Sequence, residues 1–312
     1  MKHERTLAYI AFAIVCTVWG TTYLGIRIAL ETIPPLLLTG TRFVIAGGIM
    51  LLVARLRGDA IPRDWRTLAN LAFVGFLLVG VGNLAVVWAE QWVPSGLAAL
   101  LVATAPFWMV IIEAFRPGGE RVGLRGVIGM SIGFAGVVML VSPGGGAGAI
   151  WSTAFLLGAL AIQIGSIGWQ FGSAVSKYKL GSVPPFASAA LQMLSGGVIV
   201  TLVGLAIGEA PRYTLNPRTL GALVYLTLFG SVIAYSAYVF ALAHMRTTVT
   251  SLYAYVNPVV AVFLGWLILD EPLTWMSVVA MVVILAGVAL VQTAGRTKSV
   301  PAHESEPVTK AA

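Results

Sequence analysis

A stripe of polar side chains runs along an otherwise apolar segment between residues 151 and 175. Gln163, Ser166, Gln170 and Ser173 are spaced three, four and three residues apart, so they share one face of a helix. Polar groups surrounded by apolar sequence usually face a cavity or another helix. Amides and hydroxyls at this spacing can hydrogen-bond a small solute. The length of the stripe favours cavity lining, with hydrogen bonds between helices as the alternative.

Aromatic rings and amides recur near the middle of other apolar segments. Trp19 and Tyr23 lie four residues apart, and Tyr253 and Asn257 repeat this spacing. A tryptophan at mid-span does not belong to an interfacial belt, so its ring either contacts a solute or packs in the core. The residues that we expect to bind a solute are Trp19, Tyr23, Asn83, Gln163, Trp169, Gln170, Tyr235, Tyr253 and Asn257.

Ionisable residues are scarce inside the apolar segments. Arg42 could bind a carboxylate bidentately, but tying down helix ends is the interpretation we favour. Glu113 has Arg116 three residues on, which predicts a local ion pair. A proton-coupled carrier needs a group that titrates while exposed to each side in turn. The middle of the first apolar segment holds no carboxylate, which favours uniport or exchange. If protons are coupled, Glu90 and then Glu113 are the candidates.

The sequence gives little support for an enzymatic activity, a metal site or a cofactor. The three histidines lie at or beyond the ends of apolar segments, and Cys16 is the one cysteine, so neither a thiolate metal site nor a disulfide can form within the chain. A hydrolase-like Gly-x-Ser-x-Gly stretch around Ser131 lies mid-helix rather than on a strand-to-helix elbow. We expect no metal and no cofactor. A membrane-embedded enzyme and a scaffold without transport are distant alternatives.

The composition is that of an integral membrane protein. Apolar residues make up 58% of the chain and charged residues 10%, against roughly 25% charged in soluble proteins. Only helices satisfy the backbone of such segments within a bilayer. The net charge of +7 comes from loops beside the spans, so we expect lipid and not nucleic acid as its partner. Ten spans are predicted, at 7–29, 35–54, 67–89, 94–114, 122–142, 151–175, 184–207, 219–242, 247–269 and 273–293.

The two halves of the chain carry the same pattern. Trp19 and Trp169 are 150 residues apart, and the prolines at 34–35 and 184–185 share this offset. We therefore predict repeats at 7–142 and 151–293, joined by a glycine-rich linker at 143–150, with an N-terminal segment at 1–6 and a disordered tail at 294–312. A duplicated apolar chain with helix breakers at matching positions is typical of secondary transporters.

Basic residues predict the orientation. With the N-terminus inside, the inner segments hold fifteen of the 19 Lys and Arg residues, whereas the outer loops hold only Arg212 and Arg218. The positive-inside rule then places both termini in the cytoplasm. Five spans per half is an odd number, so the second repeat should be inverted relative to the first. Inverted repeats place a substrate site near the midplane, between the halves.

Two kinds of small or rigid residue are expected to shape the helices. Pro106 and Pro258 lie near the centres of spans four and nine, where a proline frees a backbone carbonyl. We expect both to act as helix hinges, with a packing kink as the alternative. Glycines line one face of span five and should allow another helix to approach closely; they are Gly126, Gly129, Gly133 and Gly136.

Several motifs resemble the ten-helix branch of the drug/metabolite transporter superfamily, the EamA-type permeases. The matching stretches are Val18-Trp19-Gly20, Arg42-Phe43, Ala98-Ala99-Leu100-Leu101 before Pro106-Phe107, Val256-Asn257-Pro258, Leu267 to Pro272, and Ala286-Gly287-Val288. Half one departs from the pattern, because no proline follows Glu120. The resemblance implies an all-α integral membrane fold of two inverted five-helix repeats, and export of small metabolites, often amino acids.

Together these features predict a multi-pass exporter of the bacterial inner membrane that works by alternating access. The expected lining suits an uncharged or zwitterionic solute with an apolar part, such as an amino acid. An importer or exchanger of another metabolite and a proton-coupled drug efflux permease are the alternatives. Nothing in the sequence requires an oligomer.

Overall fold

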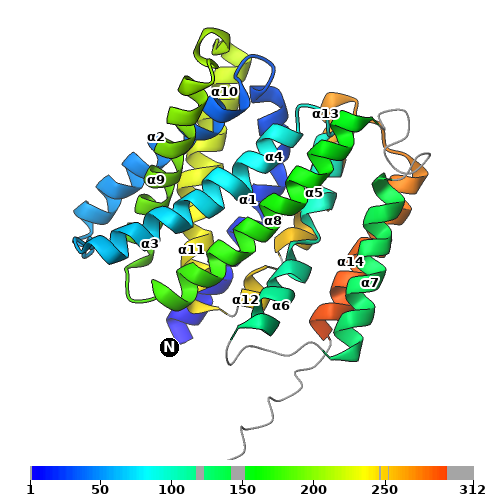
Figure 1. The fold of residues 1–312 in the computed structure, drawn as a ribbon, viewed down its shortest axis with the longest axis horizontal. Helices are drawn as coiled ribbons and strands as arrows, with labels where there is room; N and C mark the ends of the chain where they lie inside the picture. The colour runs from blue at the N-terminus through cyan, green and yellow to red at the C-terminus, as the bar shows by residue number, and fades with distance from the viewer. Residues whose placement is uncertain (1, 117–122, 142–151, 246, 252, 294–312) are drawn as a thin grey trace, which may run out of the picture.

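This computed structural model of the protein describes residues 2–116, 123–141, 152–245, 247–251 and 253–293. Over these ranges the chain forms helices and no strand (Figure 1). The linker predicted at 143–150, the tail predicted at 294–312 and Glu120 lie outside the described residues. In the first half the helices are α1 (Lys2–Ala29), α2 (Pro35–Leu56), α3 (Trp65–Gly75), the π-helix η1 (Phe76–Asn83), α4 (Leu84–Ala89), α5 (Ser95–Val102), α6 (Ala105–Phe115) and α7 (Leu124–Val141).

The second half repeats this order. Its helices are α8 (Thr153–Lys179), α9 (Pro185–Ala206), the short 3₁₀ turn η3 (Ala210–Arg212), α10 (Pro217–Tyr225), the π-helix η4 (Leu226–Ile233), α11 (Ala234–His244), α12 (Thr247–Thr250), α13 (Tyr253–Leu269) and α14 (Trp275–Thr293). Seven helical segments of the described chain are long and apolar enough to cross a membrane, and three shorter apolar helices accompany them. These ten segments coincide with the ten predicted spans.

The same local devices shape both halves. Pro35 and Pro185 occupy the first turns of α2 and α9. A backbone N–H in this turn has no acceptor within the helix, so a proline, which lacks it, loses no hydrogen bond there. Two residues after the end of each helix stands a glycine with a positive φ, 76° at Gly58 and 81° at Gly208. A residue with a side chain would be strained in this conformation. The third span of each half contains a π-helix, and η1 and η4 begin 150 residues apart. Such widened turns are frequent at functional sites.

Equivalent helices of the two halves pack against each other in antiparallel pairs. In the pair α2 and α9, Gly47 lies against Leu194, whereas Gly204 lies against Leu37, so the chains run in opposite directions. The pair α7 and α14 stands at one side of the bundle (Figure 1). There Gly136 lies against Ile284, and Gly287 lies against the backbone of residues 129 and 133. The predicted glycine face on span five therefore does pack closely against another helix.

Two carboxylates of the second half cap helices of the first. Glu271 accepts hydrogen bonds from the backbone N–H of Ser95 at 2.8 Å and from its hydroxyl at 2.9 Å, at the start of α5. Glu209 accepts from the backbone N–H of Leu37 at 2.9 Å, at the start of α2. A carboxylate at a helix N-terminus satisfies donors that have no partner within the helix and complements the helix dipole. Glu271 belongs to the motif shared with EamA-type permeases, so that motif has a structural role here.

The first helix of each half packs against the third span of the other half. α1 contacts α10, η4 and α11, whereas α8 contacts α3, η1 and α4. α1 also packs along α13, which places it between several helices of the second half. This exchange of partners brings residues from both halves to the centre of the bundle.

The α2–α9 contact predicts opposite effects for two adjacent glycines. A methyl group on Gly47 would come within 2.7 Å of the Leu194 backbone nitrogen, whereas Gly48 has nothing within 4 Å. We expect Gly47→Ala to destabilise the fold by about 1–3 kcal/mol. Gly48→Ala should be neutral or stabilising by up to about 1 kcal/mol, because alanine has the higher helix propensity. Thermal unfolding in detergent measures both, and equal losses would contradict the close contact.

Candidate functional site

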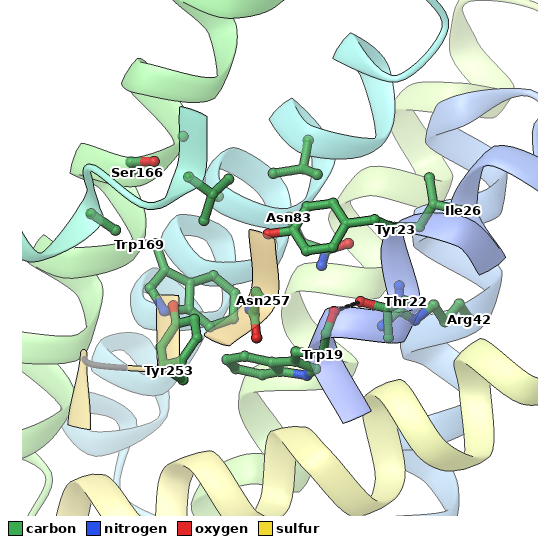
Figure 2. A pocket seen from close by; sticks show the side chains of 15 residues that line it. Trp19, Thr22, Tyr23, Ile26, Arg42, Asn83, Ser166, Trp169, Tyr253 and Asn257 are labelled. Atoms are coloured by element: carbon green, nitrogen blue, oxygen red, sulfur yellow. Dashed lines mark hydrogen bonds between the residues drawn. The ribbon is translucent and has the colours of Figure 1, made fainter. Parts of the chain in front are cut away.

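A cavity of about 70 Å³ lies at the centre of the bundle (Figure 2). This volume accommodates a few waters or part of a small solute. Eight helical elements from both halves supply the lining: α1, α2, η1, α4, α5, α6, α8 and α13. They belong to six spans, because η1 and α4 share one span and α5 and α6 share another. The lining residues are Trp19, Thr22, Tyr23, Ile26, Arg42, Gly82, Asn83, Val86, Val102, Ala105, Gly165, Ser166, Trp169, Tyr253 and Asn257.

Four aromatic rings close one end of the cavity. The ring centroid of Trp19 lies 5.4 Å from Trp169, 5.1 Å from Tyr238 and 4.9 Å from Tyr253. The Trp169 indole N–H donates to the Tyr238 hydroxyl at 3.1 Å. Figure 2 shows Trp19, Trp169 and Tyr253 gathered on one side of the cavity, away from Ile26. Edge-to-face rings at these distances pack favourably. We refer to Trp19, Trp169, Tyr238 and Tyr253 as the aromatic floor.

The π-helix η4 anchors the floor and a cation. The Trp19 indole N–H donates to the Gly230 carbonyl at 3.0 Å, and Arg42 Nε donates to Ser231 Oγ at 2.7 Å. Both acceptors lie in consecutive positions of η4. The widened turn therefore positions a ring and a guanidinium from two other helices on the cavity wall.

Uncharged polar atoms complete the lining. Asn83 Oδ1 is buried and has no hydrogen-bond partner among the described residues. The Asn257 amide nitrogen, when oriented toward acceptors, donates to the carbonyls of Cys16 and Tyr253 at 3.2 and 3.1 Å. Thr22 is bonded to its own helix at the Trp19 carbonyl, 2.7 Å away (Figure 2). The cavity thus combines aromatic surface with an acceptor that a solute could use.

The structure brings together most of the residues that the sequence predicts to bind a solute. Trp19, Tyr23, Asn83, Trp169, Tyr253 and Asn257 all line the cavity. The polar stripe on α8 divides, because Ser166 lines the cavity whereas Gln163 and Gln170 do not.

The other three predicted residues lie elsewhere. Gln163 Oε1 accepts from Thr104 at 2.8 Å and from Trp108 at 3.0 Å, so this amide holds helices together, as the alternative interpretation of the stripe proposed. Tyr235 donates to Gln192 at 3.1 Å beneath the floor. Gln170 is fully buried, and its amide has no hydrogen-bond partner within the described part of the chain.

Tyr238 and Arg42 are among the residues of the site that were not predicted to contact a solute. Tyr238 joins the aromatic floor, and its spacing of three residues from Tyr235 could have suggested it. Arg42 lines the cavity, although we favoured a structural role for it. Its position as a lone charge within an apolar span was the available signal. The sequence could not show that this side chain lies at the cavity wall and not at a helix end.

The two prolines occupy different local settings. α5 ends at Val102, and Pro106 lies in the first turn of α6, so a break separates the two halves of this span. Pro258 lies within the continuous helix α13. Gln163 bonds across the break, since its Nε2 also donates to the Leu101 carbonyl at 3.1 Å. A break beside the cavity offers a place for a helix to bend.

The two candidate coupling carboxylates also differ. Glu113 forms the predicted ion pair with Arg116 at 2.9 Å, and it accepts further hydrogen bonds from Tyr178 at 2.9 Å and Thr247 at 3.2 Å. Glu90 is fully buried, and neither carboxylate oxygen has a hydrogen-bond partner among the residues that the structure describes. No group of three or more potential metal ligands occurs in these residues either.

A second, larger hollow of about 550 Å³ has residues of α1 in its wall. Ile26 lines the cavity and its neighbour Arg27 lines the hollow. The other walls come from segments predicted to lie at the outer face, since Gln91, Trp92 and Glu271 follow spans three and nine. The α1 face that begins at Trp19 therefore continues from the aromatic floor to this end of the molecule.

Comparison with known proteins matches this architecture. The EamA-like transporter family matches residues 6–142 and again residues 156–293. The chain belongs to the EamA-like transporter family. The two matches fall on the two halves of the chain and together cover nearly all of the described helices.

Relatives of this EamA family member are named as transporters. The uncharacterized inner membrane transporter YedA of Escherichia coli K12 is 40% identical over 277 residues, which cover 88% of this chain and 87% of YedA. An uncharacterized transporter of Archaeoglobus fulgidus is 23% identical over 293 residues, covering 91% of this chain and 98% of that protein. A crystal structure with 22% sequence identity superposes with a TM-score of 0.69, covering 91% of this chain and 95% of the other. It shares the fold.

The cavity geometry separates two amides that the sequence grouped together. Asn257→Ala should weaken the apparent affinity for a transported solute roughly tenfold, because it removes a polar group of the cavity wall. Gln163→Ala should instead lower the thermal stability and leave that affinity unchanged, since Gln163 contacts only protein. Concentration-dependent uptake and thermal unfolding of both variants measure this difference. The reverse pattern would show that the cavity is not the binding site.

Proposed function

We propose that this protein is a secondary transporter that exports small amphipathic metabolites, such as amino acids, across the bacterial inner membrane by alternating access. The observation that carries the proposal is a central cavity built by residues of both halves, with the rings of Trp19, Trp169 and Tyr253 gathered on one side of it. Membership of the EamA-like family and the name of YedA support transport at an inner membrane. The solute, the direction and the cytoplasmic position of both termini are our proposals.

We propose further that the halves are inverted repeats. The antiparallel pairing of α2 with α9 and of α7 with α14 supports this, because equivalent helices of inverted repeats run in opposite directions. The exchange of partners by α1 and α8 supports it as well. A site between two such halves can open to one side and then to the other when the halves rock.

In the conformation described here the predicted inner side is closed. Beyond the aromatic floor, Glu113 on α6 accepts hydrogen bonds from Tyr178 on α8 and Thr247 on α12. Lys177 Nζ donates to the Leu242 carbonyl at 2.9 Å and also to the Met245 carbonyl. α6 belongs to the first half, and α8 and α12 to the second, so Glu113 forms an inner clamp between the halves. Opening toward the cytoplasm would break this clamp, and bending at the α5–α6 break would accompany it.

The lining supports the choice of solute. Trp19, Tyr23, Trp169 and Tyr253 offer stacking surface for an apolar side chain, while Asn83 and Asn257 offer hydrogen bonds. This combination suits a zwitterion with an apolar part. Substrates of this class need no protein carboxylate at the cavity wall, and none of the lining residues is acidic. The lining therefore favours such a solute over a permanently cationic drug.

A counterflow experiment in proteoliposomes tests the proposal. The vesicles are loaded with one unlabelled amino acid, and uptake of the same labelled amino acid is followed with no ion gradient. Uptake stimulated by internal solute is expected, because a carrier exchanges solute through a cycle that needs no net driving force. If no amino acid exchanges, with or without a pH gradient, the proposed substrate class is wrong.

A second candidate, proton-coupled transport, is favoured by one observation. Glu90 is buried without a hydrogen-bond donor, and the charged groups that act on it are Glu271, Arg27 and Arg42. A carboxyl group in this setting can carry a proton. If transport is coupled at this residue, Glu90→Gln should abolish solute movement driven by a pH gradient and leave counterflow intact. Gradient-driven movement at the wild-type rate would exclude Glu90 as the coupling group.

The inner clamp predicts the accessibility of Cys16, which lies one turn from Trp19 toward the N-terminus and is buried. Glu113→Ala removes the acceptor shared by Tyr178 and Thr247, so it should shift the population toward the inward-open state. We expect several-fold faster labelling of Cys16 by a membrane-impermeant thiol reagent applied from the cytoplasmic side. Glu31→Ala is the matched control, because it removes the more exposed ion pair with Arg218. Equal labelling rates for all three proteins would contradict a closing role for the clamp.

A further inference from the structure

Arg42 is a buried cation with spare hydrogen-bond donors on the cavity wall. Only 2% of the residue is exposed. Its Nε donates to Ser231 Oγ, which fixes the guanidinium on η4, whereas Nη1 has no hydrogen-bond partner among the described residues. Figure 2 shows Arg42 beside Thr22 at the edge of the cavity, and the residue belongs to the lining.

The surroundings hold this guanidinium in place without neutralising it. Its carbon lies 4.8 Å from the centroid of the Phe43 ring. On the other side, a side chain at position 230 would collide with it, because a methyl group on Gly230 would lie 2.9 Å from Nη2. Within the described residues no carboxylate lies at ion-pair distance from Arg42. Glu90 acts on it electrostatically from a greater distance.

The repeat provides an internal comparison. Gln192 occupies the position 150 residues after Arg42, on the equivalent helix α9. Its Nε2 donates to Ser176 at 3.1 Å and to Ser188 at 2.8 Å, and its Oε1 accepts from Tyr235 at 3.1 Å. A neutral side chain with every bond made is therefore enough to join helices at this position of the fold. The charge and the unused donors of Arg42 need another explanation.

Burying a cation without a partner is energetically costly, and such groups are normally paired. A guanidinium presents parallel N–H groups that match the two oxygens of a carboxylate. We propose that Arg42 binds a carboxylate of the transported solute through its Nη groups, while Nε remains on Ser231. This assignment rests on the proposed transport function and adds a required feature of the substrate.

The position of Arg42 also orients the solute. Thr22, Asn83 and Arg42 line the cavity together with three rings of the aromatic floor, those of Trp19, Trp169 and Tyr253. A solute whose carboxylate reaches Arg42 can place its apolar part on Trp19 and Tyr253. Amino acids with apolar side chains and small aromatic or aliphatic acids meet this requirement, whereas amines and amides of the same size do not.

The test uses two probes that differ in one group, L-phenylalanine and L-phenylalaninamide. Counterflow of each labelled probe is measured with the full-length wild type, Arg42→Gln and Arg42→Lys in proteoliposomes. The wild type should exchange phenylalanine with an apparent affinity roughly 10- to 100-fold higher than for the amide, since a charge-assisted hydrogen bond contributes that much. Arg42→Gln, which copies the side chain of Gln192, should remove the preference. Arg42→Lys should keep part of it.

Each outcome decides the matter. Equal exchange of both probes by the wild type, or an unchanged preference in Arg42→Gln, would overturn the assignment while leaving transport established. Failure of the wild type to exchange either probe would overturn this assignment, whereas the proposed function falls only if no amino acid exchanges in the counterflow experiment. The wild-type preference does not depend on any variant, so the test holds even if Arg42→Gln does not fold; gel filtration and thermal unfolding monitor the fold of both variants.

Discussion

The structure depends on one constraint, the need to give each polar group inside the apolar bundle a partner from the protein itself. Water cannot serve this purpose in hydrocarbon, so an unpartnered group there is costly. Several buried polar groups meet the requirement across the two halves of the chain. Glu271 and Glu209 cap helices of the first half, Trp19 donates to η4, and Glu113 accepts from α8 and α12. These hydrogen bonds satisfy buried groups and at the same time join the two halves.

Three of the residues that leave buried polar atoms without a partner lie at or near the cavity. Arg42 and Asn83 leave atoms without partners on the wall of the cavity, and Glu90 does so at the end of the same span as Asn83. Glycine contacts bring the paired helices close together on either side, so the cavity is not a packing failure of the whole bundle. During its cycle a transporter replaces polar contacts to its solute by polar contacts within the protein, and the reverse. Groups without a permanent partner are what such an exchange requires.

The sequence predicted the spans well because their signal is local. Ten apolar segments, the internal offset near 150 residues and the prolines at helix starts are all readable without tertiary contacts. The aromatic residues and asparagines of the cavity were also predicted, since a polar or aromatic group at mid-span has few other roles. The π-helices were not, because the widening of a turn depends on how Trp19 and Arg42 pack against it rather than on the residues of the turn.

The polar stripe on α8 shows the limit of helical periodicity. Spacing places Gln163, Ser166 and Gln170 on one face, but a face of a long helix meets several neighbours along its length. Ser166 meets the cavity, while Gln163 meets the break between α5 and α6. The sequence likewise could not show which neighbours the Arg42 side chain meets. The packing of the two halves decides which neighbour a helix meets at each level. The sequence of that helix alone does not contain this information.

The central claim is that the cavity opens alternately to the two sides. Its most direct test is a pair of distance measurements between spin labels in Cys16→Ser protein, one pair at Phe115 and His244 on the predicted inner side and one at Glu31 and Trp275 on the predicted outer side. The measurements are made with and without an amino acid that the protein exchanges. Alternating access predicts that the solute changes the two distance distributions in opposite directions. Unchanged distributions on both sides during active exchange would contradict it.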